Sequence, residues 1–300
     1  MTTVVFVVHP DRPQAADLAK RAADWLLERG HHVEPVLSDA EHSHEDDDEG
    51  VFVGAPGAMR DAFAPGPVDL AVSLGGDGTM LRTVAMAAPR EVPVLGVNLG
   101  QLGYLTEVEP AGLEGALGRF LEGDYRIEER MTLDVSLERA EGRHDGPTTD
   151  GEPQLVLNEA VVQKTHAGHT IRVAAQIAGR PFVTYAADGL LVATPTGSTA
   201  YNLSVRGPIV SPQLQAMVVT PVSPHMLFDR PLVLAPDEWL RLELASPRPA
   251  LLVLDGQRVT KLEPGDAVVC RTGRDPARLV TFGPRDFHAI LRARFNLADR

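Results

Sequence analysis

Hydrophobic positions in the first 120 residues alternate between short apolar runs and longer amphipathic segments. Apolar runs at 4–8, 70–74 and 92–97 have the length of buried strands, and 32–37 suggests a further one. Segments 14–28, 80–88 and 113–121 have helical composition, and the first of them stops before Gly30. Alternating strands and helices predict an open, Rossmann-like α/β sheet, in which ligands bind at the carboxyl ends of the strands.

Beyond Asp124 the pattern changes to alternation with a period of two residues. The predicted strands cover 130–137, 155–163, 171–177, 182–186, 190–193, 217–220, 232–234, 240–244, 251–254 and 267–271. This second half is predicted to be all-β, as a sandwich or as stacked sheets. Helical composition returns at 286–294, which we expect to pack back on the first lobe. The predicted domains are 1–124, completed by about 275–300, and 125–274.

Composition narrows the classes of partner. The 300 residues include 28 basic and 41 acidic ones, a net charge of −13, which opposes non-specific binding to nucleic acid. No apolar run approaches the roughly 20 residues of a membrane span, and the first residues read as a strand and not as a signal peptide. The single Cys270 fits a reducing cytoplasm. Charged and polar stretches at 41–49 and 141–153 are predicted to be surface loops.

The first candidate site is Gly75-Gly76-Asp77-Gly78-Thr79, where a predicted strand turns into a helix. Glycine lets a ligand approach the backbone closely, and the free amides of a first helical turn favour an anion such as phosphate. Because a carboxylate repels phosphates, Asp77 beside a phosphate site is expected to act as a metal ligand, a hydroxyl acceptor or a general base. Alternatively, Asp77 only caps the helix.

Two further stretches combine polar and small residues. Segment 192–204 carries hydroxyls, Gly197 and Tyr201 after a strand, a composition that permits close approach and hydrogen bonding. The pair Asn158-Glu159 interrupts an apolar run, which is unfavourable unless the pair is hydrogen-bonded or binds a ligand. A position on an edge strand or a cross-sheet hydrogen bond explains the pair equally well.

These motifs together resemble the bacterial NAD kinases. The resemblance rests on the order and spacing of Gly75-Gly76-Asp77-Gly78-Thr79, Asn158-Glu159, Asp188-Gly189 and Thr194-Pro195-Thr196-Gly197-Ser198-Thr199-Ala200-Tyr201. Shorter fragments, among them Ser223-Pro224-His225 and Asp255-Gly256-Gln257, extend it over nearly the whole chain. The Gly-Gly-Asp-Gly-Thr turn alone is shared with lipid kinases and is similar to phosphofructokinase motifs, whereas the 194–201 string is far more specific.

The resemblance implies phosphoryl transfer from ATP, or from polyphosphate in some members, to the 2′-hydroxyl of the adenosine ribose of NAD. It also implies Mg²⁺ or another divalent cation held by the phosphates, no metal site built from protein side chains, and a homodimer or homotetramer. By position, Asp77 would be the catalytic base, and Gly75, Gly76, Gly78 and Thr79 would bind phosphate. The NAD site would comprise Asp77, Gly78, Arg82, Asn158, Glu159, His169, Asp188, Thr199, Ala200, Tyr201, Asn202, Leu203, Ser204 and Gln257.

Three positions depart from the family string Ser-Leu-Ser-Ala-Gly-Gly-Pro-Ile at 202–209, namely Asn202, Val205 and Arg206. Asn202 stands where the family usually has Ser, and Arg206 stands where it has Gly. At positive φ, Arg206 would be strained; alternatively it adds a cation near a phosphate. Two other functions remain open: a kinase of a lipid or sugar hydroxyl, which shares the glycine-rich turn, and an NAD-binding regulator without catalysis.

Overall fold

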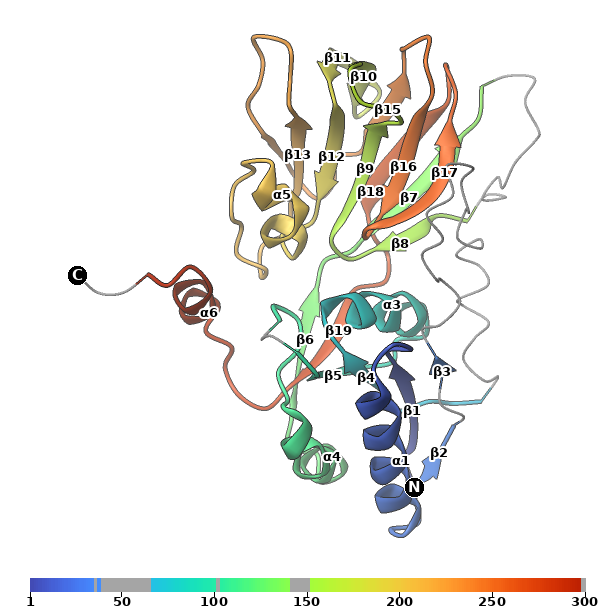
Figure 1. The fold of residues 1–300 in the computed structure, drawn as a ribbon, viewed down its shortest axis with the longest axis vertical. Helices are drawn as coiled ribbons and strands as arrows, with labels where there is room; N and C mark the ends of the chain where they lie inside the picture. Colours follow the sequence, from blue (N-terminus) through green and yellow to red (C-terminus); the bar gives the residue numbers. More distant parts are fainter. Residues whose placement is uncertain (35–36, 39–65, 101–102, 141–151, 298–300) are drawn as a thin grey trace. The chain divides into compact units, whose positions relative to one another are not determined.

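The computed structural model describes residues 1–34, 37–38, 66–100, 103–140 and 152–297, which divide into two compact units (Figure 1). In its described part, the first unit comprises 1–34, 37–38, 66–100, 103–129 and 277–297, and the second comprises 130–140 and 152–276. The block 41–49 and most of the stretch 141–153, both predicted as loops, lie outside the described residues.

The first unit is built on a mostly parallel sheet. Its strands follow the order β2-β1-β4-β5-β19-β6, and β3 pairs with β1. The pairs β1/β2, β1/β3, β1/β4, β4/β5 and β5/β19 are parallel. The strands are β1 Thr3–Val8, β2 His32–Val33, β3 Leu37–Ser38, β4 Leu70–Gly75, β5 Val94–Asn98, β6 Arg126–Arg130 and β19 Ala277–Thr281.

Helices cover both faces of this sheet (Figure 1). They are α1 Pro13–Leu27, α3 Asp77–Ala87 and α4 Leu113–Leu121, with short 3₁₀ turns at Ala88–Arg90 and Pro110–Gly112. The late helix α6 Phe287–Arg294 was expected to pack back on this unit, but it buries none of its residues, and its Arg294 lies over the Tyr104 ring. α1 and α4 bury Ala and Leu residues at helical spacing in one cluster with the strands, whereas α3 packs on the opposite face. None of the helices in the described residues has the length and apolar character needed to cross a membrane.

The second unit consists of two antiparallel six-stranded sheets. One has the order β11-β10-β15-β18-β7-β8, with β7 Leu133–Glu138, β8 Gln154–Val156, β10 Ile171–Ile177, β11 Arg180–Ala187, β15 Leu240–Leu244 and β18 Ala267–Thr272. The other has the order β14-β13-β12-β9-β16-β17, with β9 Glu159–Lys164, β12 Gly189–Ala193, β13 Met217–Val222, β14 Leu232–Leu234, β16 Ala250–Leu254 and β17 Gln257–Leu262. A 3₁₀ turn at Gly197–Thr199 and the short helix α5 Tyr201–Ser204 follow β12.

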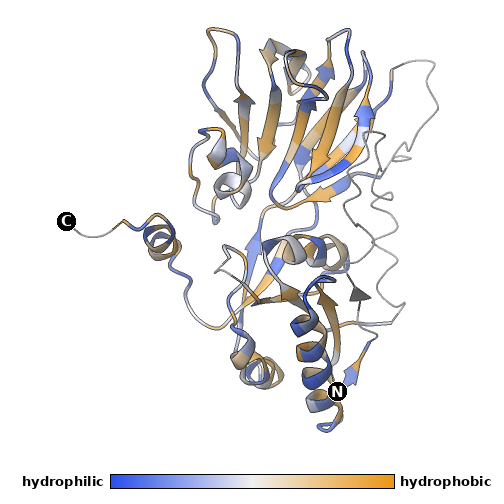
Figure 2. Ribbon diagram, viewed as in Figure 1, coloured by the Kyte–Doolittle hydropathy of each residue, from blue (hydrophilic) through white to orange (hydrophobic). Residues whose placement is uncertain are grey.

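Side chains from both sheets of the second unit form one core. Alternate residues of β12 illustrate the pattern: Leu190 and Val192 face this shared core, and Leu191 and Ala193 face a second cluster on the other side of their sheet. Figure 2 shows the apolar colour following the strands of this unit. The predicted fold class, an α/β lobe followed by β-rich sheets, is confirmed, and the late strand β19 completes the first sheet.

Several strand predictions were wrong in detail. The predicted strand 155–163 is two strands, β8 and β9, which belong to different sheets. The predicted strand 130–137 is interrupted between β6 and β7, and 32–37 covers β2 and only the first residue of β3. β6, β17 and β19 were missed, because β6 and β17 carry charged side chains at exposed positions and β19 is a brief apolar run.

Candidate active site

The glycine-rich turn lies at the carboxyl end of β4, where α3 begins at Asp77. Gly75 leaves no room for a side chain, because a Cβ there would overlap the Thr79 hydroxyl. Beside Gly78, by contrast, a Cβ would meet nothing within 4 Å. The first helical bond runs from the Met80 amide to Gly76, so the amides of 77–79 have no partner within the helix. These amides could bind phosphate, whereas the Thr79 side chain is buried.

The carboxylate of Asp77 is fixed by the loop that follows β5. One oxygen accepts the backbone N–H of Tyr104 at 3.0 Å, and the other accepts that of Leu105 at 3.2 Å. Gly103 permits this approach, because a Cβ there would overlap Asp77. On the other side of the loop, Arg285 donates to the Tyr104 carbonyl at 2.9 Å. Sequence reasoning missed Arg285, which lies 181 residues from its partner and has no motif around it.

The prediction that Asn158 and Glu159 lie inside one strand was wrong. They lie where the chain passes from β8 in one sheet to β9 in the other, a segment that we call the β8–β9 crossing. The crossing is held on its amide side by the Asp255 carboxylate, which accepts the N–H of residues 157, 158 and 159 at 2.7–3.1 Å. On its carbonyl side, the Thr194 amide donates to Asn158 O at 2.9 Å, and the Thr194 hydroxyl donates to Leu157 O at 2.6 Å. The backbone amides and carbonyls of the crossing, which lie between the two sheets, are therefore hydrogen-bonded to Asp255 and Thr194.

Thr194 also joins the Asn158-Glu159 crossing to the 194–204 segment. Its hydroxyl accepts the Gly197 amide at 3.0 Å, and Gly197 packs so closely that a Cβ would overlap the Asn158 carbonyl. Two motifs that stand 36 residues apart in sequence thus form one unit of structure. We call residues 157–159 together with 194–204 the acceptor cluster.

Asn202 is fully buried within the acceptor cluster. Its amide nitrogen donates to Ser198 O and Pro208 O, and its amide oxygen accepts from the Thr220 hydroxyl at 2.7 Å. The Asn202 side-chain amide therefore forms its hydrogen bonds with protein groups and stabilises the turn at 198–208. Tyr201 and Ser204 are exposed, and Thr199, Ala200 and Leu203 are half-buried, so these five residues are accessible to a ligand.

Glu159 is 6% exposed, and among the described residues its Oε2 has no hydrogen-bond partner. Desolvation raises the pKa of Glu159 to about 8; the charge of Asp255 adds to the shift, and a hydrogen bond from the Tyr201 backbone opposes it. Desolvation likewise raises the pKa of Asp255 to about 6, against the effect of its three backbone bonds. A buried carboxyl with an unused oxygen in a polar turn is typical of a binding site.

The remaining predicted residues lie elsewhere in the units. Gln257 begins β17 and pairs with Leu254, which in turn pairs with Ala160, the residue after Glu159. Glu159 lies opposite Ala193, at the end of β12, whereas Asp188 precedes the start of that strand. The Asp188 carboxylate forms an ion pair with Lys164 at 2.8 Å. The exposed His169 follows β9 on that same far side. Within one chain, the structure therefore does not bring Asp188 and His169 to Asn158 and Glu159.

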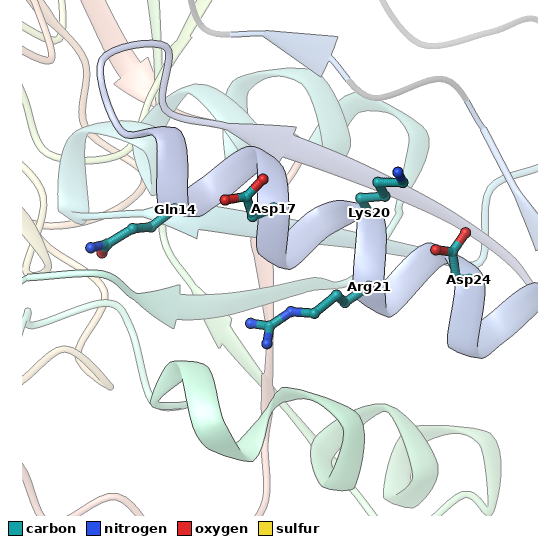
Figure 3. Close-up of a pocket in the computed structure, with 5 residues that line it drawn as sticks. All are labelled: Gln14, Asp17, Lys20, Arg21 and Asp24. Carbon is teal, nitrogen blue, oxygen red and sulfur yellow. The ribbon is translucent and has the colours of Figure 1, made fainter.

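Arg82 lies in α3 of the first unit, where it is half-buried, and desolvation lowers its pKa. A shallow hollow elsewhere on this unit runs along α1, lined by Gln14, Asp17, Lys20, Arg21 and Asp24. Figure 3 shows these five side chains spread along the helix without converging on one point. The hollow includes none of the predicted site residues.

Comparison with known proteins identifies both parts of the chain. Residues 4–125 match the ATP-NAD kinase N-terminal domain, and residues 157–282 match the ATP-NAD kinase C-terminal domain. The NAD kinase of Heliobacterium modesticaldum is 45% identical over 294 residues, 97% of this chain and 98% of the relative. The NAD kinase of Nocardia farcinica is 37% identical over 98% of this chain and 91% of the relative.

Solved structures of lower identity share the fold. Yeast NADH kinase, crystallised with NADH, superposes with a TM-score of 0.81 at 23% identity, over 100% of this chain and 89% of that one. An NAD kinase from Archaeoglobus fulgidus, crystallised with ATP, gives 0.69 at 24% identity, over 97% and 98%. The predicted family and activity are confirmed over the alternatives of a lipid or sugar kinase and of a regulator. The chain belongs to the NAD kinase family, the enzymes that use ATP to phosphorylate NAD to NADP.

Proposed function

We propose that Asp77 is the general base of this NAD kinase. The observation that carries the proposal is the fixed geometry of its carboxylate, which accepts one backbone N–H on each oxygen, from Tyr104 and Leu105. A carboxylate has about four lone-pair positions, so two remain for a substrate hydroxyl. Asp77 is also half-buried and not enclosed, which leaves it within reach of a ligand.

The proposed reaction moves one proton and one phosphoryl group. The 2′-hydroxyl oxygen of the adenosine ribose of NAD attacks the γ-phosphorus of ATP, and a new P–O bond forms. The bond from that phosphorus to the β–γ bridging oxygen breaks, and ADP leaves. Asp77 orients the hydroxyl and takes its proton, because a neutral secondary hydroxyl is a weak nucleophile.

We propose that the N-terminus of α3 binds the transferring phosphate. The amides of Asp77, Gly78 and Thr79 point out of the helix end, and the space beside Gly78 admits a ligand. Among the described residues, no group of three or more His, Cys, Asp or Glu lies close enough to hold a metal ion. A Mg²⁺ held chiefly by the ATP phosphates fits this setting, and when bound it would neutralise developing negative charge.

We propose that the acceptor cluster binds NAD. Glu159 offers its unused Oε2, and Asn158 is half-buried beside it. Tyr201 has an exposed ring on which a base could stack. The proposed set also contains Asp77, Gly78, Arg82, Gln257 and residues 199–204, of which Asn202 acts through the backbone turn that it supports. His169 and Asp188 complete the proposed set, although within one chain they lie at the end of β12 far from Glu159.

The two units have separate proposed roles as domains. Residues 1–124, completed by about 275–300, carry the phosphoryl-transfer turn, and residues 125–274 carry the NAD cluster and the contacts of a homodimer or homotetramer. The exposed apolar side chains of Phe182, Leu227 and Val233 in the second unit support the proposed assembly. The single cysteine supports a cytoplasmic location. Light scattering after size exclusion measures the assembly.

The role of Asp77 is tested by Asp77→Asn, measured as NADP formed from NAD, ATP and Mg²⁺. We expect kcat to fall about 10²- to 10⁴-fold, the usual contribution of a general base, with NAD still raising the melting temperature. Asp69→Asn is the matched control, because the Asp69 carboxylate also accepts a backbone N–H, from Thr3 at 2.8 Å, away from the turn. A normal rate in Asp77→Asn would overturn the assignment.

The metal and the donor are tested in the same assay with the unmodified enzyme. EDTA should abolish NADP formation, and excess Mg²⁺ should restore it. Polyphosphate in place of ATP then measures donor preference. Activity that persists in EDTA would contradict the proposed metal requirement.

A further inference from the structure

Asp255 occupies the turn of a tight β-hairpin. β16 ends at Leu254, whose register partner Gln257 begins β17, so the loop contains only Asp255 and Gly256. Both residues have positive φ, 47° and 81°. Asp-Gly is a favoured pair for such a two-residue turn, because Asp tolerates the left-handed conformation and Gly adopts it freely. The turn therefore explains why Asp is acceptable here, but not where its carboxylate points.

The carboxylate leaves its own hairpin and binds three consecutive amides about 97 residues away. One oxygen accepts Leu157 N–H at 2.8 Å, and the other accepts Asn158 N–H at 2.7 Å and Glu159 N–H at 3.1 Å. The Asp255 amide returns a bond to the Glu159 carbonyl at 3.0 Å. The β8–β9 crossing is thus fixed at each residue that carries a predicted NAD contact.

We propose that Asp255 is a positioning residue of the NAD site, which holds Asn158 and Glu159 in the orientation that meets the dinucleotide. This inference rests on the proposed binding of NAD by the acceptor cluster. Thr194 donates hydrogen bonds to the carbonyls of the same crossing, and Asp255 accepts hydrogen bonds from its amides, so the two residues together fix its backbone. Loss of the carboxylate frees three amides at once and allows the pair to rotate.

Asp255 also sets the charge around Glu159. The two carboxyl groups lie close enough for the charge of Asp255 to raise the pKa of Glu159. Replacing Asp255 by a neutral residue therefore changes both the orientation and the protonation of Glu159, and both changes act on NAD without acting directly on ATP.

The test is Asp255→Asn in the full-length enzyme, with KM measured separately for NAD and for ATP. Asn keeps the turn, since Asn-Gly is as favourable as Asp-Gly, but it presents one acceptor oxygen and an NH₂ group to three N–H donors. We expect KM for NAD to rise at least 10-fold and KM for ATP to stay within twofold. An unchanged KM for NAD, or an equal rise in both constants, would overturn the proposal.

A second variant and two controls keep the result interpretable. Asp255→Gly retains the hairpin without any carboxylate and should show the same selective rise; an unchanged KM for NAD there also contradicts the proposal. Asp266→Asn removes another carboxylate of this unit that accepts backbone amides, from Ala140 and Glu263, and should change stability without a selective effect on NAD. Asn158→Ala tests the underlying site: if it leaves KM for NAD unchanged, the proposed NAD site itself is wrong, whereas a rise there with a normal Asp255→Asn refutes only the role of Asp255.

Discussion

Gly78 in the first unit and Gly197 in the second stand in comparable glycine-containing turns, but their surroundings differ. A Cβ on Gly78 would meet nothing within 4 Å, whereas a Cβ on Gly197 would overlap the Asn158 carbonyl. Gly207 resembles Gly197, since a Cβ there would overlap the Asn202 amide. The missing side chain leaves room for a ligand in the first turn and for the protein's own backbone in the second. The same residue type in two matched motifs therefore leaves open space in one unit and permits close backbone packing in the other.

Alanine at these two glycines should separate the roles, with the largest effect expected at Gly197. Gly197→Ala forces the Thr194–Gly197 turn away from Asn158, and we expect a loss of about 3 kcal/mol of unfolding free energy. Gly78→Ala should leave stability unchanged or raise it slightly, because Ala is the better helix former. Its expected effect is a rise of about 10-fold or more in KM for ATP. Urea denaturation and steady-state kinetics measure the pair.

Gly115, in α4 of the first unit, provides the control. A Cβ there also meets nothing within 4 Å, and the residue lies outside the candidate site, so Gly115→Ala should change neither kinetic constant. Equal stability of Gly197→Ala and the unmodified enzyme would contradict the packing role. A normal KM for ATP in Gly78→Ala would contradict the proposed phosphate site.

The first unit was the easier one to predict from sequence, because its site is local. The apolar run, the glycines and the helix that follow one another at 70–88 form β4, the Asp77 turn and α3 almost as predicted. Its long-range partner was not predictable: Arg285 contacts the loop beside Asp77 from the far end of the chain. A single arginine in a polar tail carries no pattern that indicates its partner.

In the second unit, the motifs were recognised but their structural basis was not. Asn158-Glu159 was placed inside a strand, because hydrophobic periodicity does not reveal that a chain changes sheets. At the change of sheet, three backbone amides donate to Asp255, which local reasoning treats only as a turn residue. Asn202 was assigned to NAD by resemblance, yet its amide bonds lie within the protein. Sheets are assembled from distant segments, so their interior contacts are not visible in local sequence.

The carboxyl groups of the two units differ as well. Asp77 is half-buried and binds two amides, whereas Glu159 is buried with one oxygen unused, and desolvation raises its pKa to about 8. Between pH 4.5 and 8 the folded protein keeps this proton and the unfolded chain loses it. The unfolded state therefore binds fewer protons, and stability falls as pH rises through this window.

Glu159→Gln should remove that pH dependence. From pH 5.5 to 7.0, the unmodified protein without NAD should lose about 2 kcal/mol of unfolding free energy more than the variant, since each pKa unit corresponds to about 1.4 kcal/mol. Urea denaturation at the two pH values gives the comparison. Glu138→Gln, an exposed carboxyl in the same unit, is the control and should follow the unmodified protein. Parallel pH profiles for Glu159→Gln and the unmodified protein would show that Glu159 ionises normally.

The smallest expected effect concerns Arg206, which follows the acceptor cluster where the family pattern has Gly. Its φ is +66°, so the strain predicted for an arginine at positive φ is present. Arg206→Gly should therefore stabilise the second unit by about 1 kcal/mol, whereas Arg206→Ala removes the same charge but keeps the strain. The difference in unfolding free energy between the two variants measures the backbone strain at residue 206, and the change in KM for ATP that they share measures the effect of the lost charge. If both variants raise KM for ATP equally, the cation acts on a phosphate; if KM stays constant and only the glycine variant gains stability, Arg206 is a strained surface residue. In that second case Arg206 contributes to neither the fold nor ligand binding, in contrast to Gly197 and Gly207 nearby, where a Cβ would overlap the Asn158 carbonyl and the Asn202 side-chain amide.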